Sequence, residues 1–261
     1  MLAAARSREV RGPYVRLDCR ESNTFRRVPS LANPRGGTDG FRDETDGFSV
    51  ASAAPPSVTT AIWFDLDGTL VPFPDYGAVL ATACEAVGIG DADAFAAAYN
   101  DAFFDYFGDL TPEPYRRAAA DALAAVDADA APEPFVAAVR DAEFGAAEAP
   151  PVVRRTLSTL AAADGVALGV CTNGVPEWQR EKLRESGLAA HVDATVVSYE
   201  TGAHKPAPEP FDRAEALIEA DRRVMIGDGE ESDVVGARER GWEAVHVDGP
   251  ADVPAAVDAV R

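Results

Sequence analysis

Four acidic side chains lie where apolar runs of this chain end. Asp65 and Asp67 follow one run and are two residues apart, a spacing that directs both side chains to one side of an extended chain. Asp228 follows a later run, and Asp233 comes five residues after it. Close carboxylates repel one another unless one is protonated or a cation lies between them. Oxygen ligands of this kind predict a site for a hard cation, and Mg²⁺ suits phosphate chemistry.

Two further motifs carry groups that bind anions. Thr172, Asn173 and Gly174 follow a third apolar run, and a hydroxyl with free amides before a helix forms an anion pocket. Helix capping by Thr172 or Asn173 is the ordinary alternative. Lys205, which precedes Pro206, is one of only two lysines in the chain. In a chain that otherwise uses arginine, this lysine suggests a need for a compact point charge.

The remaining lysine and the three histidines have less distinctive surroundings. Lys182 lies in the charged helical stretch 181–185 and is predicted to belong to a solvated helix face. His204 could act as an acid or base, but the neighbouring Lys205 accounts for the turn without it, so no catalytic role is assigned. His191 and His246 have no evident partners in the sequence and are interpreted as ordinary surface or core histidines.

Strands and helices are expected to alternate through most of the chain. Apolar runs predict five strands, at 61–64, 166–171, 193–197, 223–226 and 244–247. Helical patterns lie near 176–187, 208–220 and 231–240. This alternation predicts an α/β fold with a doubly wound, Rossmann-like parallel sheet. Sites in such sheets lie beyond the carboxyl ends of the strands, where the motifs fall.

One long helical stretch interrupts the alternation. Residues 73–148 are predicted to form a helical cap inserted after the first strand, and 58–72 with 149–261 to form the core. An aromatic stripe with helical spacing supports a packed core for the cap, and it is also compatible with a lid that lines a substrate cavity. The stripe consists of Phe95, Tyr99, Phe103 and Phe107.

In order and context, the motifs resemble those of the haloacid dehalogenase-like hydrolase superfamily. They are DLDGT at 65–69, TNG at 172–174, KP at 205–206 and GDGEESD at 227–233. The match spans 61–247, and the helical insert resembles the C1-type cap of the superfamily.

The resemblance implies a phosphatase that works through an aspartyl-phosphate. It makes Asp65 the nucleophile and Asp67 the acid and then the base. Thr172, with Asn173 and Gly174, would hold the phosphoryl group, and Lys205 would neutralise its charge. Asp65, the backbone carbonyl of Asp67, Asp228 and Asp233 would hold Mg²⁺.

The sequence is compatible with several alternatives to a phosphatase. A 2-haloacid dehalogenase has no leaving alkoxide to protonate, and the dehalogenase pattern lacks an acid where Asp67 stands, so phosphatase is favoured. A phosphomutase must exclude water between half-reactions, which the sequence does not reveal. A non-catalytic relic that binds metal or a partner is disfavoured, because every catalytic position is filled. No run of 18 apolar residues exists, which excludes the ion pumps.

The net charge of the chain disfavours some classes of binding partner. There are 24 basic and 44 acidic residues, for a net charge of −20, which disfavours nucleic acid and anionic membranes. The stretch 73–149 holds 15 acids and three arginines, so a small phosphate monoester is preferred to a polyanion. Arg116 or Arg117 could bind a substrate carboxylate, although a solvated helix face is the simpler interpretation. A monomer or weak homo-oligomer is expected.

The acidity and the cysteines suggest the working environment. Salt near 1 M shortens the Debye length to about 3 Å and screens repulsion, so we expect a protein adapted to concentrated salt, more stable at 2 M than at 0.1 M KCl. Three cysteines fit neither a disulfide framework nor a zinc site, which favours the reducing cytoplasm. Residues 1–57 carry a net charge of +2 and are predicted to be disordered, or absent if translation starts at Val58.

Overall fold

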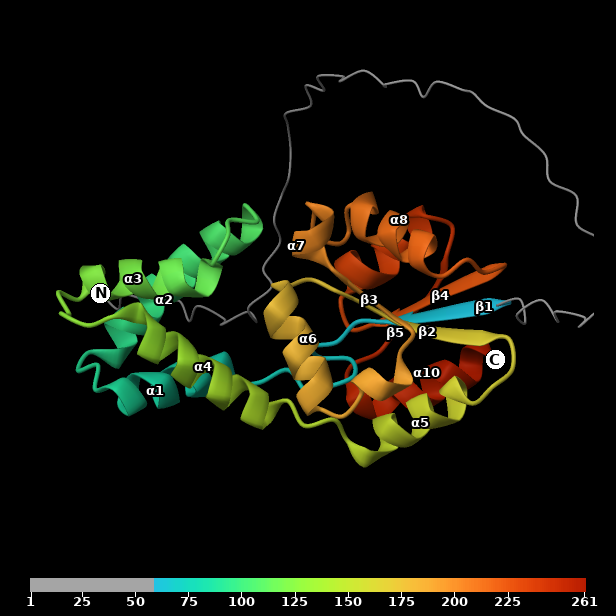
Figure 1. Cartoon of the computed structure of the whole chain (residues 1–261), viewed down its shortest axis with the longest axis horizontal. Helices are drawn as coiled ribbons and strands as arrows, with labels where there is room; N and C mark the ends of the chain where they lie inside the picture. Colours follow the sequence, from blue (N-terminus) through green and yellow to red (C-terminus); the bar gives the residue numbers. More distant parts are fainter. Residues whose placement is uncertain (1–58) are drawn as a thin grey trace, which may run out of the picture. The chain divides into compact units, whose positions relative to one another are not determined.

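The computed structural model describes residues 59–261, and the expectations for 1–57 lie outside this range. Within the described range, five parallel strands form one sheet in the order β3-β2-β1-β4-β5 (Figure 1). The strands are β1 (Thr60–Phe64), β2 (Val166–Thr172), β3 (Ala194–Val197), β4 (Arg222–Gly227) and β5 (Glu243–His246). The central strand β1 is flanked by β2 and β4, and Phe64 is in register with both Val170 and Ile226. The predicted doubly wound parallel sheet is confirmed.

Helices cover both faces of the sheet and form two separate apolar cores. Helices α5 (Pro151–Ala161) and α10 (Val253–Val260) pack on one face, where Leu157, Leu168 and Val257 belong to one buried cluster. Helix α8 (Pro208–Leu217) packs on the other face, where Phe211 and Trp63 belong to a second cluster. Because both faces are buried, the central strands β1 and β2 are nearly continuous apolar runs with little alternation. This is why short runs were sufficient to locate them.

The inserted segment after β1 is helical, as expected. It contains α1 (Tyr76–Val87), α2 (Ala92–Gly108), α3 (Pro114–Ala125) and α4 (Pro132–Ala146). Asp75 and Asp91 cap α1 and α2 by accepting hydrogen bonds from the amides of Ala78 and Ala94. Prolines begin α3 and α4, at the position where the missing N–H costs nothing.

The aromatic stripe of α2 serves both the interior of the cap and its junction with the core. Phe95 and Tyr99 are buried and pack against Phe135 of α4, with ring centroids 4.6 and 5.2 Å apart. Farther along α2, Phe107 stacks on His204, a residue of the core, at 4.5 Å. The first half of the stripe therefore forms the predicted packed core, and its end reaches the sequence motifs.

The remaining connections include one departure from the expected elements. Helix α6 (Pro176–Glu185) follows β2, and a short 3₁₀ turn, η1 (Ala189–His191), precedes β3. Helix α7 (Ser198–Thr201) follows β3, and η3 (Pro250–Asp252) precedes α10. The helix expected near 231–240 is instead a π-helical turn, η2 (Glu230–Val235), followed by α9 (Gly236–Glu239). Such turns often accompany functional sites, and this one carries Asp233.

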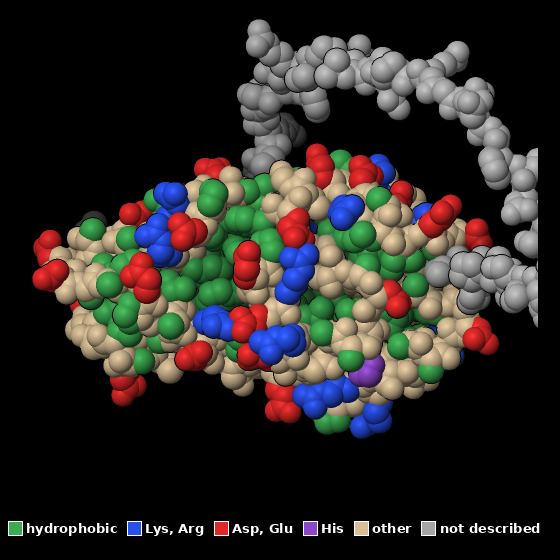
Figure 2. Space-filling view, viewed as in Figure 1, with side chains coloured by type: hydrophobic (Ala, Val, Ile, Leu, Met, Phe, Trp, Pro, Cys, Tyr) green, Lys and Arg blue, Asp and Glu red, His purple; other side chains and the backbone are tan. Residues whose placement is uncertain are grey.

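The surface is charged, and its acidic side chains are scattered. Figure 2 shows Asp and Glu side chains over the visible face, with Arg and Lys among them. Among residues 59–261, no helix combines the length and the apolar character that crossing a membrane requires.

Candidate active site

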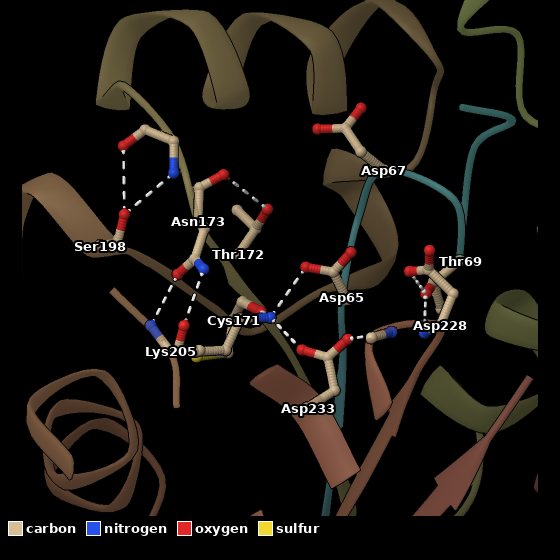
Figure 3. Close-up of polar contacts among 12 residues, drawn as sticks. Asp65, Asp67, Thr69, Cys171, Thr172, Asn173, Ser198, Lys205, Asp228 and Asp233 are labelled. Carbon is tan, nitrogen blue, oxygen red and sulfur yellow. Dashed lines mark hydrogen bonds and ion pairs between the residues drawn. The ribbon is translucent and has the colours of Figure 1, made fainter. Parts of the chain in front are cut away.

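Three of the four acidic residues singled out above converge at the carboxyl edge of the sheet. One carboxylate oxygen from each of Asp65, Asp228 and Asp233 lies within 4.8 Å of the others. Asp65 directly follows β1, Asp228 directly follows β4, and Asp233 lies on η2. Parallel packing of β1 beside β4 brings these segments together, as the sequence predicted. Figure 3 shows Asp65 and Asp233 directed toward the same ammonium group, that of Lys205.

Lys205 is the buried cation of this cluster. Its Nζ donates to Asp65 Oδ1 at 2.8 Å, to Asp233 Oδ1 at 2.5 Å and to the Cys171 carbonyl at 2.6 Å. Burial lowers the pKa of the Lys205 ammonium, but Asp233 and Asp65 outweigh that effect and raise it. The lysine therefore carries its charge into the interior, as the sequence interpretation required.

When all three carboxylates are ionised, they and the one ammonium leave two negative charges in a largely buried space. Burial, the largest effect, raises the pKa of Asp65 to about 8; Asp233 and Asp228 also raise it, and Lys205 opposes them. The pKa of Asp228 is raised mainly by burial, against a hydrogen bond from Thr69. A bound divalent cation would balance the two charges and favour the ionised carboxylates. The oxygen donor set fits Mg²⁺.

Two glycines allow the carboxylates to approach closely. Gly68 has a φ of +86°, and a Cβ at this position would lie 2.3 Å from Asp228 Oδ2. A Cβ at Gly227 would lie 2.3 Å from Asp233 Oδ2. Thr69 completes this side of the cluster, because its hydroxyl donates to Asp228 Oδ1 at 2.9 Å and accepts from the Asp228 amide. Thr69 is a site residue that the sequence analysis did not select, although it lies within the DLDGT motif.

Asp67 has a different environment from the other three acids. Its carboxylate accepts hydrogen bonds from two side chains of α6, Gln179 to Oδ2 at 2.8 Å and Lys182 to Oδ1 at 2.6 Å. Figure 3 shows the Asp67 carboxylate directed away from Lys205 and the cation cluster. The side chain of Asp67 is thus available for a role other than binding the cation.

The prediction for Lys182 was wrong. Lys182 is 2% exposed, and it forms ion pairs with Asp67 of the core and with Glu143 of the cap helix α4. A pattern that does identify it is the spacing to Trp178, since residues four apart share one face of a helix and Trp178 is buried in the apolar cluster of the cap. Gln179 and Glu143 were likewise not selected from the sequence.

The TNG motif is next to the cluster, but much of its polar capacity is used within the protein. Thr172 is buried, and its hydroxyl accepts a hydrogen bond from Gln179 at 3.0 Å. The Asn173 side chain forms two hydrogen bonds with the backbone of Lys205, and the Gly174 amide donates to Ser198 Oγ at 2.9 Å. Asn173 and Gly174 therefore help to position the loop that carries Lys205. The Asn173 side chain and the Gly174 amide already have hydrogen-bond partners within the protein.

His204 links the same loop to the cap. Its Nε2 lies 2.8 Å from the Phe107 carbonyl at the end of α2, and its Nδ1 lies 2.8 Å from Ser198 Oγ. A neutral imidazole that donates through Nε2 and accepts at Nδ1 satisfies both partners. His204 therefore connects the loop that carries Lys205 to the end of α2.

The remaining residues named in the sequence analysis have no assigned part in the site. Arg116 pairs with Glu113, and Arg117 donates to the Pro112 carbonyl on the exposed surface. His246, for which no partner was foreseen, contacts the Asp228 carbonyl through Nε2 at 2.9 Å. Cys171 is buried, and burial raises the pKa of its thiol to about 12, so the thiol is neutral at ordinary pH.

The burial of His204 at its contact with the end of α2 is expected to make the stability of the protein depend on pH. Burial lowers the pKa of His204, so the unfolded chain binds the proton more readily and stability falls as the pH drops below about 6.5. The partners of the ring are uncharged, since burial also raises the pKa of the adjacent Tyr199 phenol to about 12. Melting of wild type and His204→Gln at pH 7.5 and 5.5 tests this. The variant should lose less stability on acidification, and equal losses would contradict the prediction.

Comparison with known proteins identifies the family. The model of a family described as haloacid dehalogenase-like hydrolase matches residues 59–241. This chain belongs to that family.

Two curated relatives illustrate the similarity. The chain is 32% identical over 205 residues to the ribulose-1,5-bisphosphate 5-phosphatase of Halopiger xanaduensis, which covers 73% of this chain and 85% of that protein. It is 44% identical over 86 residues to the phosphoserine phosphatase of Thermus thermophilus, which covers 32% of this chain. The chain spans only about a third (34%) of the length of that relative.

Solved structures share the fold at low sequence identity. The HAD-hydrolase YfnB from Bacillus subtilis, solved bound to magnesium, has a TM-score of 0.57 and 22% identity, with 74% of this chain and 89% of that chain covered. The L-2-haloacid dehalogenase from Xanthobacter autotrophicus has a TM-score of 0.54 and 16% identity, with 72% and 77% covered. These likenesses establish the fold alone.

Proposed function

We propose that this protein is a Mg²⁺-dependent phosphatase that hydrolyses small phosphate monoesters through an aspartyl-phosphate on Asp65. The observation that carries the proposal is the pairing of Asp65 with Lys205 inside a three-carboxylate cluster, with a second aspartate, Asp67, two residues farther along the chain. A dehalogenase would need the nucleophile but has no leaving oxygen for Asp67 to protonate.

Each residue has a role in this proposal. Asp65 attacks phosphorus and forms the covalent intermediate, which divides hydrolysis into two easier steps. Lys205 holds Asp65 through its Nζ and neutralises charge on the transferring group. Asp67 gives a proton to the leaving oxygen and then takes one from the water that hydrolyses the intermediate. The Gln179 amide donates hydrogen bonds to both Asp67 and Thr172. The Thr172 hydroxyl binds the phosphoryl group.

The cation site belongs to the same proposal. Asp65, Asp228, Asp233 and the backbone carbonyl of Asp67 would hold Mg²⁺, which supplies charge stabilisation to the phosphoryl oxygens when bound. Asp65 is thereby both nucleophile and ligand. The chain also uses Thr69 to orient Asp228 and the Gly229 amide to orient Asp233, since these groups hydrogen bond to the two carboxylates.

A small metabolite that carries a phosphate monoester is the proposed substrate class. The acidic cap segment disfavours polyanions, because 15 acids and three arginines lie between 73 and 149. The names of the two relatives above indicate small phosphorylated molecules as well: phosphoserine carries one phosphate, and ribulose-1,5-bisphosphate carries two. The proposal places the protein in the cytoplasm as a monomer or weak homo-oligomer.

The decisive assay is phosphate release from a panel of monoesters, with and without Mg²⁺, in low and high salt. The panel should include p-nitrophenyl phosphate, phosphoserine and ribulose-1,5-bisphosphate. Turnover that requires Mg²⁺ supports the proposal. Turnover of 2-chloropropionate but of no phosphate ester would instead favour a dehalogenase. Transfer of a phosphoryl group between two positions of a sugar would favour a mutase, and the absence of any turnover would favour a binding protein.

A further inference from the structure

Three charged side chains form a buried chain from the cap to Asp67. The Lys182 ammonium on α6 lies 2.6 Å from Asp67 Oδ1 and also forms an ion pair with Glu143 Oε1 of α4. The Lys182 and Glu143 side chains are 3% and 1% exposed. The hydroxyl of Tyr76, on α1, donates to Glu143 Oε2 at 2.6 Å. A carboxylate of the cap and a carboxylate of the core thus share one ammonium group.

Stability alone does not explain this arrangement. Burial lowers the pKa of Lys182, but Asp67 and Glu143 together raise it, so the ammonium remains charged. Buried ion pairs are often replaced by well-packed apolar residues without loss of stability, because desolvation offsets their attraction. The ammonium does, however, contact the Asp67 carboxylate directly and can fix its position.

Asp67 is held at both oxygens from one face of α6. Gln179 and Lys182 are three residues apart, so they project from neighbouring positions of the helix, and each donates to a different oxygen of the Asp67 carboxylate. Glu143 contacts Lys182, and Lys182 in turn contacts Asp67. The orientation of the Asp67 carboxylate therefore depends on a cap residue that acts through Lys182.

The Asp67 carboxylate lies on the side of the sheet edge where a leaving group would be enclosed. Helix α6 also carries Trp178, which packs in the apolar cluster of the cap and stacks on Tyr115 with ring centroids 3.9 Å apart. Asp67 thus faces the side of the sheet edge that the cap covers. A leaving group attached to phosphorus at Asp65 and enclosed by the cap would extend toward this side.

We propose that Lys182 and Glu143 are positioning residues for proton transfer to the leaving group. Glu143 of the cap fixes the Lys182 ammonium, and Lys182 together with Gln179 fixes the rotamer of the Asp67 carboxyl. The inference rests on the proposed function, in which Asp67 is the acid. It makes the cap a part of the acid–base machinery as well as a cover, since a misplaced catalytic group loses much of its effect.

Leaving-group dependence separates this role from a structural one. Phenyl phosphate and p-nitrophenyl phosphate have nearly the same shape, but phenolate is the poorer leaving group and depends more on protonation. The ratio kcat/KM reports on steps up to phosphoryl transfer to Asp65, so it excludes hydrolysis of the intermediate. Loss of correct Asp67 orientation should therefore reduce kcat/KM for phenyl phosphate more than for p-nitrophenyl phosphate.

The experiment compares kcat/KM of wild type, Lys182→Met, Glu143→Gln and the double variant on both esters. For Lys182→Met we expect a loss of about 100-fold with phenyl phosphate, the lower end of what a positioned acid contributes, and a loss several times smaller with p-nitrophenyl phosphate. Glu143→Gln should act in the same direction. Its effect should disappear in the Lys182→Met background, because Glu143 acts through Lys182.

A matched control lies on the same two helices. Arg140 of α4 and Glu181 of α6 form an ion pair whose side chains are 37% and 29% exposed. The variant Arg140→Gln/Glu181→Gln should change kcat/KM equally, and little, for both esters. If Lys182→Met leaves Glu143 as an unpaired buried charge and fails to fold, the double variant, which removes both charges, carries the test.

Two kinds of failure can be distinguished. Equal losses on the two esters, or independent effects of Lys182→Met and Glu143→Gln, would overturn the positioning inference while Asp67→Asn still abolished turnover of phenyl phosphate. If wild type hydrolyses neither ester with Mg²⁺, the proposed function fails. If Asp67→Asn shows the same ratio of kcat/KM between the two esters as wild type, the acid role of Asp67 fails. The positioning inference fails in either case.

Discussion

Replacing Asp65 with asparagine is expected to abolish phosphatase activity, with a fall in kcat of at least about 10³-fold, a conservative figure for loss of a nucleophile. An amide cannot form the aspartyl-phosphate, and it presents a weaker ligand to a cation. The fold should survive. Burial and the neighbouring acids raise the pKa of Asp65 to about 8, so a neutral side chain relieves repulsion in the cluster.

The measurement pairs kinetics with thermal melting. Without Mg²⁺, Asp65→Asn should melt at or above the temperature of wild type, and addition of Mg²⁺ should raise its melting temperature less than that of wild type. Asp75→Asn is a suitable control, since Asp75 caps α1 on the surface and has no contact with the cluster. Full activity in Asp65→Asn would refute the nucleophile assignment, and inactivity caused by unfolding would appear as a lost transition.

The carboxylate cluster could be anticipated from sequence because a parallel sheet imposes it. Residues that directly follow neighbouring strands meet at one edge of the sheet, so Asp65 after β1 and Asp228 after β4 had to lie close together once the strands were located. The central strands were evident because burial on both faces makes β1 and the second half of β4 apolar. Lys205 was evident for a different reason, the rarity of lysine in an arginine-rich chain.

The network around Asp67 was missed because it depends on which face of helix α6 packs against the cap. The segment 181–185 is almost entirely charged, and only contact of one face of α6 with the cap makes Lys182 a buried residue. Local polarity predicts exposure, whereas tertiary packing of Trp178 decides which side of the helix is inside. The position of His204 was hidden for the same reason, since the Phe107 carbonyl that it contacts lies 97 residues away in the chain.

Replacing Lys205 with methionine is expected to be the most destabilising single change in the site. The variant leaves Asp65 and Asp233 without their shared ammonium in a buried space, and removal of one partner from a buried ion pair costs about 3–5 kcal/mol. Activity should fall as well, because Asp65 loses the group that orients it and that neutralises the phosphoryl charge. Chemical denaturation without Mg²⁺ measures the first effect, and kcat with Mg²⁺ the second.

Mg²⁺ should partly reverse the loss of stability in Lys205→Met. A divalent cation can compensate the carboxylates that Lys205 leaves behind, and without the competing ammonium it should bind the folded state more tightly, which raises stability by linkage. Lys182→Met is the matched control, because Lys182 is an equally buried, ion-paired lysine that contacts Asp67 and Glu143 but none of the three clustered carboxylates. Mg²⁺ should therefore raise the melting temperature more in Lys205→Met than in Lys182→Met. An equal response of the two variants would mean that Asp65, Asp228 and Asp233 do not form the cation site.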